Sequence, residues 1–268
     1  MKSAVKLLLH YLSVSVRSQM QYKTSFAISL VAQFFLMSVE LVAIWALFAR
    51  FGTLATWTLP EVAFLYGMSN MAFAISETSA RGFDIFGSRV VKQGNFDWIL
   101  LRPRSTALQV AGLEFRLRYL GRLLQGACVL IWAMAKLGIV WTAAKALLAI
   151  FAIFGGACMF SGLFVIQAVI SFWTTESLEI FNTVTYGGAE TAQYPLSIYR
   201  DWFRKFFTFV IPLACLNYFP ALAILGRTDP SGASPLIQWM SPVFGVFFLL
   251  VTLQFWKFGV RHYRSTGS

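Results

Sequence analysis

Long apolar runs separated by short polar segments dominate the chain. Such runs occupy residues 26–48, 60–79, 123–140, 146–173 and 236–258. A helix needs about 20 apolar residues to cross roughly 30 Å of hydrocarbon, whereas a membrane β-barrel would show short segments of alternating polarity. The pattern therefore predicts an all-α polytopic membrane protein, with a single transmembrane domain over residues 1–268.

One region permits two interpretations. Residues 177–194 are moderately apolar, and residues 206–225 are more apolar but contain Pro212 and Pro220. Proline interrupts a helix interior, so the second stretch suits a bent or re-entrant segment. Either stretch can supply a further span. The sequence therefore predicts six spans and leaves open which stretch is the fifth.

The first 25 residues have a different pattern from the spans. Apolar positions fall on one helical face, while Lys2, Lys6, His10 and Arg17 interrupt any continuous apolar stretch. Residues 1–25 therefore predict an amphipathic helix that lies at the membrane interface. Its unopposed positive charges place this end on the cytoplasmic side.

The most polar internal segment is residues 81–122, which carry eight Lys or Arg and three acidic residues. This charge predicts a cytoplasmic loop. Within it, Trp98, Ile99 and Leu101 form an apolar patch of helical spacing, and Pro103 ends the helix. We interpret the patch as a docking handle for a cytoplasmic partner. The simpler alternative is a loop that folds back on the membrane surface.

Composition excludes an ordinary soluble domain, because 58% of residues are hydrophobic, 12% are charged and 27 are Phe. The net charge of +11 follows from basic cytoplasmic segments, so it does not predict nucleic-acid binding. Cys128, Cys158 and Cys215 lie within apolar runs without paired spacing. They indicate neither a disulfide framework nor a metal site.

The first span contains Gln33 and Glu40, and the second contains Asn70 and Glu77; Glu40, Asn70 and Glu77 are the candidates for a polar or translocation role. A charge at mid-bilayer costs about 3 kcal/mol, so these groups should face protein or water. Glu40 suits a hydrogen bond between helices or, less simply, a contact with substrate. Glu77 and Arg81 lie one turn apart and suit a structural ion pair.

No catalytic constellation is found along the chain, and no Gly-rich loop ends in Gly-Lys-Ser or Gly-Lys-Thr. The sequence therefore predicts that the chain is not an enzyme and holds no cofactor. If it drives transport, the energy comes from elsewhere. The fourth span carries small residues that allow close helix packing, within one subunit or between two: Gly155, Gly156, Ala157, Ser161 and Gly162.

Several segments together resemble the permease subunits of type-2 ABC exporters. These are QGNFDWILLRP at 93–103, YPLSIY at 194–199, FVIPLACLNYFPALAILG at 209–226 and FGVRHYRSTGS at the end of the chain. With the amphipathic start, they resemble the DUF990-like branch of this ABC-2 family, in which non-identical subunits pair. The resemblance covers nearly the whole chain.

The resemblance implies six transmembrane helices, an N-terminal interfacial helix and both termini in the cytoplasm of a bacterial inner membrane. Residues 177–194 would be the fifth span, and residues 195–228 a re-entrant outer hairpin that contains Pro195, Pro212 and Pro220. It also implies a coupling region for the ATPase within residues 81–122, made of Phe96, Asp97, Trp98, Leu100, Leu101, Arg102 and Pro103. ATP and Mg would be bound by separate cytoplasmic ABC ATPase subunits.

In this family picture the chain pairs with a sister permease, a heterodimer being favoured over a homodimer, within membrane lipid. It would export a hydrophobic or amphipathic substrate by alternating access. Two other hypotheses remain. One is a membrane-embedded lipid-modifying enzyme that uses Glu40, Glu77 or Glu190, and the other is a passive channel or scaffold. The substrate and the direction of transport stay open.

Overall fold

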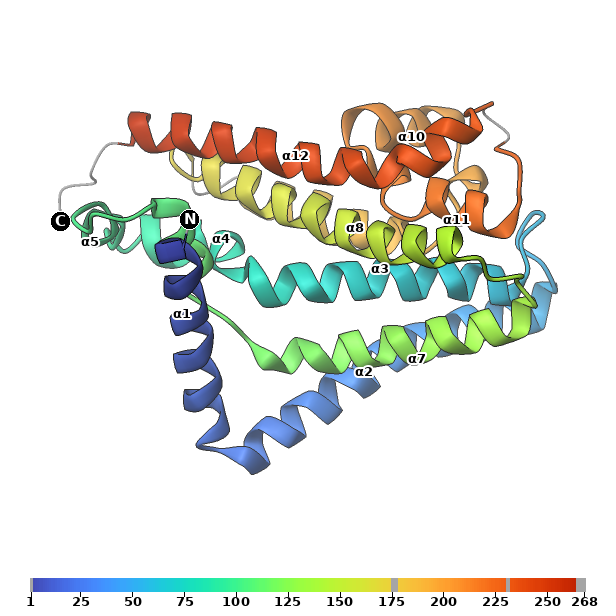
Figure 1. Ribbon diagram of the computed structural model, residues 1–268, viewed down its shortest axis with the longest axis horizontal. Helices are drawn as coiled ribbons and strands as arrows, with labels where there is room; N and C mark the ends of the chain where they lie inside the picture. The colour runs from blue at the N-terminus through green and yellow to red at the C-terminus, as the bar shows by residue number, and fades with distance from the viewer. Residues whose placement is uncertain (1, 175–177, 230–231, 264–268) are drawn as a thin grey trace.

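In the computed structural model, long helices run side by side, and a layer of short helices closes one end of the bundle (Figure 1). The structure describes residues 2–174, 178–229 and 232–263. The long helices are α2 (Lys23–Phe51), α3 (Leu59–Ser79), α7 (Leu120–Leu137), α8 (Ala143–Ile170) and α12 (Pro235–His262). The described residues form no β-strand, which confirms the predicted all-α class.

Four described helical segments are long and apolar enough to cross a membrane: Lys23–Phe51, Leu117–Leu137, Ala143–Ile170 and Pro235–His262. A fifth arises if the bent pair Asp201–Val210 and Leu213–Leu225 is counted as one span. These segments match the predicted first, third, fourth and last spans. The predicted total of six is not confirmed.

Helix α3, the predicted second span, has 21 residues but is less apolar than the others. It packs mainly against α7 and α8. Glu61, Ser69, Asn70 and Glu77 are among its many buried residues. Because neighbouring helices cover α3, its polar side chains meet protein groups instead of lipid, and its composition need not be that of a lipid-facing span.

The region after α8 is broken into short elements. They are α9 (Leu178–Thr191), η3 (Leu196–Ile198), α10 (Asp201–Lys205), η4 (Phe206–Val210), η5 (Leu213–Cys215) and α11 (Tyr218–Leu225). The 14 residues of α9 extend about 21 Å at 1.5 Å per residue, less than the hydrocarbon thickness. Residue 177, where the alternative fifth span would begin, lies outside the described residues.

The prolines of this region have different roles. Pro212 lies at the break between η4 and η5, where the bent pair turns by 75°. Pro195 precedes the short helix η3. Pro220, which we expected to break a helix, instead lies in the first turn of α11. A backbone N–H at that position would have no intrahelical partner, so proline costs no hydrogen bond there. The expectation that Pro220 breaks a helix was therefore wrong.

Small residues allow α8 and α12 to approach closely. A Cβ atom added to Gly155 would overlap the carbonyl oxygen of Pro242, and one added to Gly245 would overlap the carbonyl oxygen of Gly155. A Cβ atom added to Gly162 would overlap the ring of Phe248. Of the small residues predicted for the fourth span, Gly155 and Gly162 therefore pack against α12, whereas Gly156 faces Ala72 of α3 and Leu216, all within one subunit.

This contact predicts that Gly155→Ala lowers the thermal unfolding midpoint in detergent. The added methyl group must push two backbones apart, which typically costs about 1–3 kcal/mol. Gly187→Ala is the matched control, because nothing lies within 4 Å of a Cβ added at Gly187. Equal midpoints for the two variants would contradict this description of the α8–α12 contact.

Helix α1 (Lys2–Met20) lies across the direction of the long helices, at the same end of the bundle as α5 (Figure 1). The chain turns sharply before α2 begins at Lys23. Helix α12 also ends at this side of the molecule, whereas α10 and α11 lie at the opposite end (Figure 1). This crosswise orientation is the one expected for the predicted interfacial helix.

Candidate functional site

The segment between α3 and α7, predicted as a cytoplasmic loop with one helical patch, is a packed layer of short helices. It contains α4 (Arg81–Asp84), η1 (Gly87–Val91), α5 (Phe96–Leu100), α6 (Thr106–Ala111) and η2 (Leu117–Tyr119). The layer lies at the end of the bundle where α12 ends (Figure 1). Its most exposed apolar residues lie on and directly after α5.

An aromatic cluster holds α5 against the bundle. Phe96 is fully buried, and its ring centroid lies 5.2 Å from those of Phe86 and Phe172 and 4.9 Å from that of Tyr263. Trp256 of α12 packs against the same rings, and its indole N–H donates to Thr106 Oγ1 at 3.0 Å. Residues from the ends of α8 and α12 thus fix the position of α5.

The opposite side of α5 is exposed. Trp98 is 70% exposed and Leu101 is 77% exposed, while Ile99 is buried beside Phe96. The predicted patch of Trp98, Ile99 and Leu101 is therefore divided, because Ile99 faces inward. The end of α5 is fixed by Gln109, whose amide Nε2 donates to the Ile99 carbonyl at 3.1 Å. Two large apolar side chains thus project from a rigid support.

The other predicted residues of this region lie around the exposed side. Asp97 is half-buried in the first turn of α5, where a carboxylate suits the helix dipole. Leu100 is 41% exposed, and Arg102 and Pro103 are exposed just after the helix ends. Of the predicted coupling residues, Phe96 is the one that points into the bundle.

A buried ion pair joins α3 to α7. Arg122 Nη1 lies 3.3 Å from Glu77 Oε2, and Arg122 Nε donates to Asn70 Oδ1 at 2.7 Å. The guanidinium also stacks over the Phe73 ring, 4.5 Å from its centroid. Arg81 approaches the other oxygen of Glu77 at 3.6 Å, which confirms the predicted pair. Glu77 therefore lies between two guanidinium groups.

A second set of polar groups continues toward α8 and α9. Arg81 lies 2.7 Å from Asp84 Oδ2 and donates to the Tyr186 hydroxyl, which in turn donates to Asp84. Gln167 Nε2 donates to Asp84 and to Asn182. Burial raises the pKa of the Asp84 carboxyl, while Arg81 and the hydrogen bonds partly oppose that rise. Together with the Glu77–Arg122 pair, these contacts connect α3, α4, α7, α8 and α9 in one network.

This network forms part of the wall of a polar cavity of about 440 Å³. The cavity lies between α2, α3, α9 and the segment that leads into α7. We call it the polar cavity, and it is lined by Gln33, Met37, Glu40, Phe73, Glu77, Arg81, Arg118, Tyr119, Arg122, Tyr186, Ala189 and Glu190. Three carboxylates and three guanidinium groups therefore surround a single space.

The fold brings together the intramembrane residues singled out in the sequence. Asn70 and Glu77 share Arg122, and Glu40 of α2 lines the same polar cavity as Glu77. Glu40 Oε2 accepts a hydrogen bond at 3.2 Å from Gln193 Nε2, which lies in the turn just after α9, so Glu40 meets a protein partner but not one within another helix. Glu190 of α9 is exposed at the cavity. An exposed carboxylate within an apolar bundle requires water or another protein beside it.

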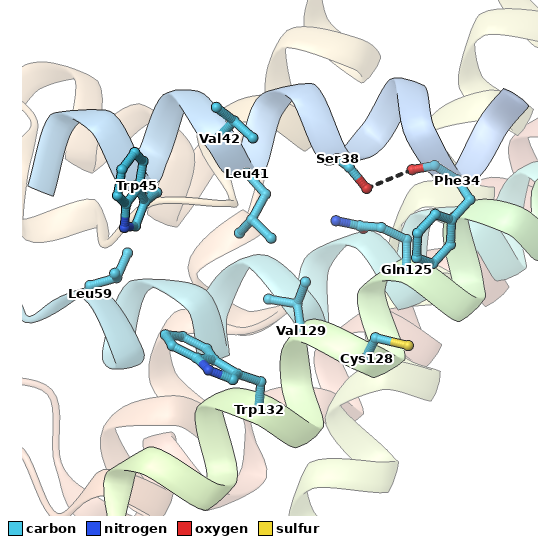
Figure 2. Close-up of a pocket in the computed structure, with 10 residues that line it drawn as sticks. All are labelled: Phe34, Ser38, Leu41, Val42, Trp45, Leu59, Gln125, Cys128, Val129 and Trp132. Carbon is cyan, nitrogen blue, oxygen red and sulfur yellow. Dashed lines mark hydrogen bonds between the residues drawn. The ribbon is translucent and has the colours of Figure 1, made fainter. Parts of the chain in front are cut away.

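A second hollow, which we call the apolar groove, lies on a neighbouring face of α2 (Figure 2). Its volume is about 530 Å³. It is lined by Phe34, Ser38, Leu41, Val42, Trp45, Leu59, Gln125, Cys128, Val129 and Trp132. The Ser38 hydroxyl donates its hydrogen bond to the Phe34 carbonyl oxygen at 2.9 Å, so the groove offers mainly apolar surface (Figure 2).

One polar contact lies between the two hollows. The Tyr66 hydroxyl donates to the carbonyl oxygen of Met37, on the wall of the polar cavity, at 2.8 Å. It also accepts from Gln125 Nε2, on the wall of the apolar groove, at 3.2 Å. Because α2 borders both hollows, a movement of α2 against Tyr66 would change both at once.

Sequence reasoning missed the partners in the polar network. Arg122 was counted only as one of the basic residues of its segment, and Tyr186 and Gln167 were not singled out. Glu77 and Arg122 are 45 positions apart, so spacing along the chain could not pair them. The available signal was the cost of a buried carboxylate, which requires a cation from another helix.

Comparisons with known proteins identify the family. The sequence profile described as ABC-2 family transporter protein matches residues 34–267, which is most of the chain. Neither the curated proteins nor the solved structures gave a match. The matched range includes the apolar groove, the α5 layer and all the residues that line the polar cavity except Gln33. The chain therefore belongs to the ABC-2 family of transporter proteins, as a multi-pass membrane component of an ABC transporter.

Proposed function

We propose that this chain is the permease subunit of an ATP-driven exporter and that α5 is the surface on which a separate cytoplasmic ATPase docks. The observation that carries the proposal is the exposure of Trp98 on α5 and of Leu101 directly after it, while Phe96 anchors the helix. Large apolar side chains on a rigid support are the usual centres of protein interfaces. ATP and Mg would bind to the partner.

The aromatic cluster supports a coupling role for α5. Phe96 packs against Phe172 at the end of α8 and near Trp256 of α12, so a force applied to α5 acts directly on two long helices. On its other side, the layer continues through α4 into α3 and the polar network. Movement of the ATPase would thereby reach the walls of the polar cavity.

The two hollows support an amphipathic substrate. The polar cavity offers charged groups, the apolar groove offers aromatic and aliphatic surface, and α2 borders both. A substrate with a polar head and an apolar body would place its head in the polar cavity and its body in the apolar groove, with little desolvation cost. We infer export by alternating access, in which α2 moves relative to α3 and α7.

The open side of the polar cavity supports pairing with a sister permease. Glu40 and Glu190 lie on α2 and α9, beside side chains of α2 that this subunit leaves uncovered. Contact with lipid would be costly for the carboxylates, whereas a second permease would enclose the cavity and provide an aqueous path. Residues 195–228, at the opposite end from α5, would then lie at the outer surface of the inner membrane.

The test is affinity purification of the full chain from its native membrane in mild detergent. We expect an ATP-hydrolysing subunit and a second, non-identical permease to be recovered with it. Recovery of the ATPase with only one kind of permease would replace the heterodimer by a homodimer. Recovery of no ATP-hydrolysing partner would contradict the proposed function and favour the enzyme or channel hypothesis.

A further inference from the structure

A third hollow lies where the interfacial helix α1 meets α2, and the function proposed above does not use it. We call it the elbow pocket. It has a volume of about 310 Å³ and is lined by Ser18, Gln19, Tyr22, Ser25, Phe26, Ser29, Arg116 and Arg118. None of these eight described residues is acidic. Three serine hydroxyls and two guanidinium groups therefore face one small space.

Gln19 fixes the geometry of the elbow pocket. Its amide Nε2 donates to the Phe115 carbonyl at 2.7 Å, and its Oε1 accepts from the Leu117 N–H at 2.9 Å. The Gln19 amide thus makes one donated and one accepted hydrogen bond to the backbone before α7, and these hold that segment against the end of α1. Arg116 and Arg118 are carried by this fixed segment, so their positions in the pocket are built into the fold.

Part of the donor capacity of both arginines is already used. Arg116 pairs with Glu114 through Nε, and Glu114 also meets Arg89 at 3.3 Å. Arg118 donates to the Tyr119 hydroxyl and stacks on that ring at 4.9 Å. Since each guanidinium carries five N–H donors, further donors remain at both residues. The single carboxylate of Glu114 does not neutralise this basic neighbourhood.

The beginning of α2 adds to the same site. The Tyr22 side chain at the N-cap makes no hydrogen bond to the first turn of α2. Ser25 lies in that turn, and Ser29 follows one turn later on the same face. Hydroxyl groups, guanidinium groups and the N-terminus of a helix are together the donors that bind phosphate in proteins.

The surroundings indicate a lipid as the source of that phosphate. The elbow pocket lies at the junction of a helix placed across the bundle and a helix long enough to span the membrane (Figure 1). Beyond Ser29, the same face of α2 continues with Ala32 and with Leu36, which is 61% exposed. A phospholipid could place its phosphate in the pocket and its chains along α2. Basic pockets between membrane helices bind lipid head groups in this way.

We infer that the elbow pocket is a binding site for the phosphate group of a cytoplasmic-leaflet phospholipid, held by Arg116, Arg118, Ser25 and Ser29. Arg118 also lines the polar cavity, so the two hollows share one guanidinium group. Occupation of the pocket would hold α1, the start of α2 and the segment before α7 together. The inference does not depend on an ATPase and can be tested without transport.

The experiment is native mass spectrometry of the full chain in detergent, titrated with phosphatidylglycerol or with diacylglycerol of the same chains. We expect one tightly retained phosphatidylglycerol, bound at least about tenfold more tightly than diacylglycerol, because charge-assisted hydrogen bonds contribute on the order of tenfold each. The double variant Arg116→Gln/Arg118→Gln should lose at least about tenfold in affinity. Lys257→Gln/Arg261→Gln, which removes two exposed charges from α12 at the same end, should keep the affinity.

A variant at Ser25 tests the same pocket in case Arg116→Gln/Arg118→Gln misfolds. Ser25 is exposed, so Ser25→Glu should fold normally and repel the phosphate, whereas Ser25→Ala should bind nearly as the parent does. Equal losses in the two double variants would overturn the inference, because general surface charge would then explain the binding. Full affinity in Arg116→Gln/Arg118→Gln or in Ser25→Glu would overturn it as well. Displacement of the lipid by millimolar inorganic phosphate would overturn the lipid assignment.

Discussion

Replacing Trp98 and Leu101 together by alanine is expected to abolish transport while the chain still folds and inserts. Both side chains are largely exposed, at 70% and 77%, so their removal takes little from the packing of the subunit. If the ATPase docks here, Trp98 is a central aromatic contact of the kind that contributes about 2 kcal/mol or more, and Leu101 adds apolar area beside it. The double variant should weaken ATPase binding by roughly 100-fold or more. Co-purification of the ATPase and vesicle transport measure the effect.

The matched control is Trp202→Ala/Phe209→Ala. Trp202 and Phe209 are 67% and 80% exposed, and they belong to the α10–η4 segment at the opposite end of the bundle. This variant removes a similar apolar area without touching α5, so it should retain the ATPase. Equal retention of the ATPase by both double variants would remove α5 from the docking surface.

Replacing Arg122 by methionine is expected to cause the largest loss of stability among single substitutions in the polar network. The change keeps much of the side-chain volume but leaves Glu77 and Asn70 without the guanidinium between them. Removing one partner of a buried ion pair typically costs about 3–5 kcal/mol. The thermal unfolding midpoint and the yield of monodisperse protein in detergent report this loss.

Two further variants isolate the buried charge. Arg204→Met removes the cation of an ion pair whose acid, Asp201, is 80% exposed, and such pairs contribute about 0–1 kcal/mol. Glu77→Gln/Arg122→Met should recover part of the lost stability, because it removes the unpaired carboxylate. If Arg122→Met and Arg204→Met have the same thermal unfolding midpoint, the α3–α7 ion pair does not stabilise the fold.

Helices that face lipid could be predicted well from the sequence, because hydropathy reports that environment directly. The predicted spans at residues 26–48 and 236–258 lie within α2 and α12, and the span at 146–173 matches α8 except for its last three residues. Helix α3 has Asn70 and Glu77 in its interior and a lower hydropathy, since it is surrounded by other helices. The region after α8 could not be assigned, because the short α9 and the 75° bend depend on tertiary packing.

The candidate site was predictable only in part. The unusual Trp98 and Leu101 in a basic segment indicated a docking element, and the structure exposes both. The direction of Ile99 could not be inferred, because it depends on an aromatic cluster that Phe172 and Trp256 supply from distant helices. Glu40, Asn70 and Glu77 were identified from the cost of polar groups in a bilayer. Their common cavity required the three-dimensional arrangement.

The elbow pocket could not be foreseen at all. Its arginines lie about 100 positions from its serines along the chain. Arg116 and Arg118 were counted only as part of the positive charge that predicts a cytoplasmic segment. Gln19, which brings the two parts together, gave no signal because its partners are backbone groups of residues 115 and 117. Contacts between a side chain and distant backbone leave no periodic pattern in a sequence.

The claim that α5 contacts the ATPase is tested most directly by site-specific photo-crosslinking in native membranes. A photoreactive phenylalanine analogue would replace Trp98 in one variant and Trp202 in another. Both sites are similarly exposed, but they lie at opposite ends of the bundle. We predict a crosslink to an ATP-hydrolysing subunit from position 98 and none from position 202. No such crosslink from position 98, or one from position 202 instead, would contradict the account.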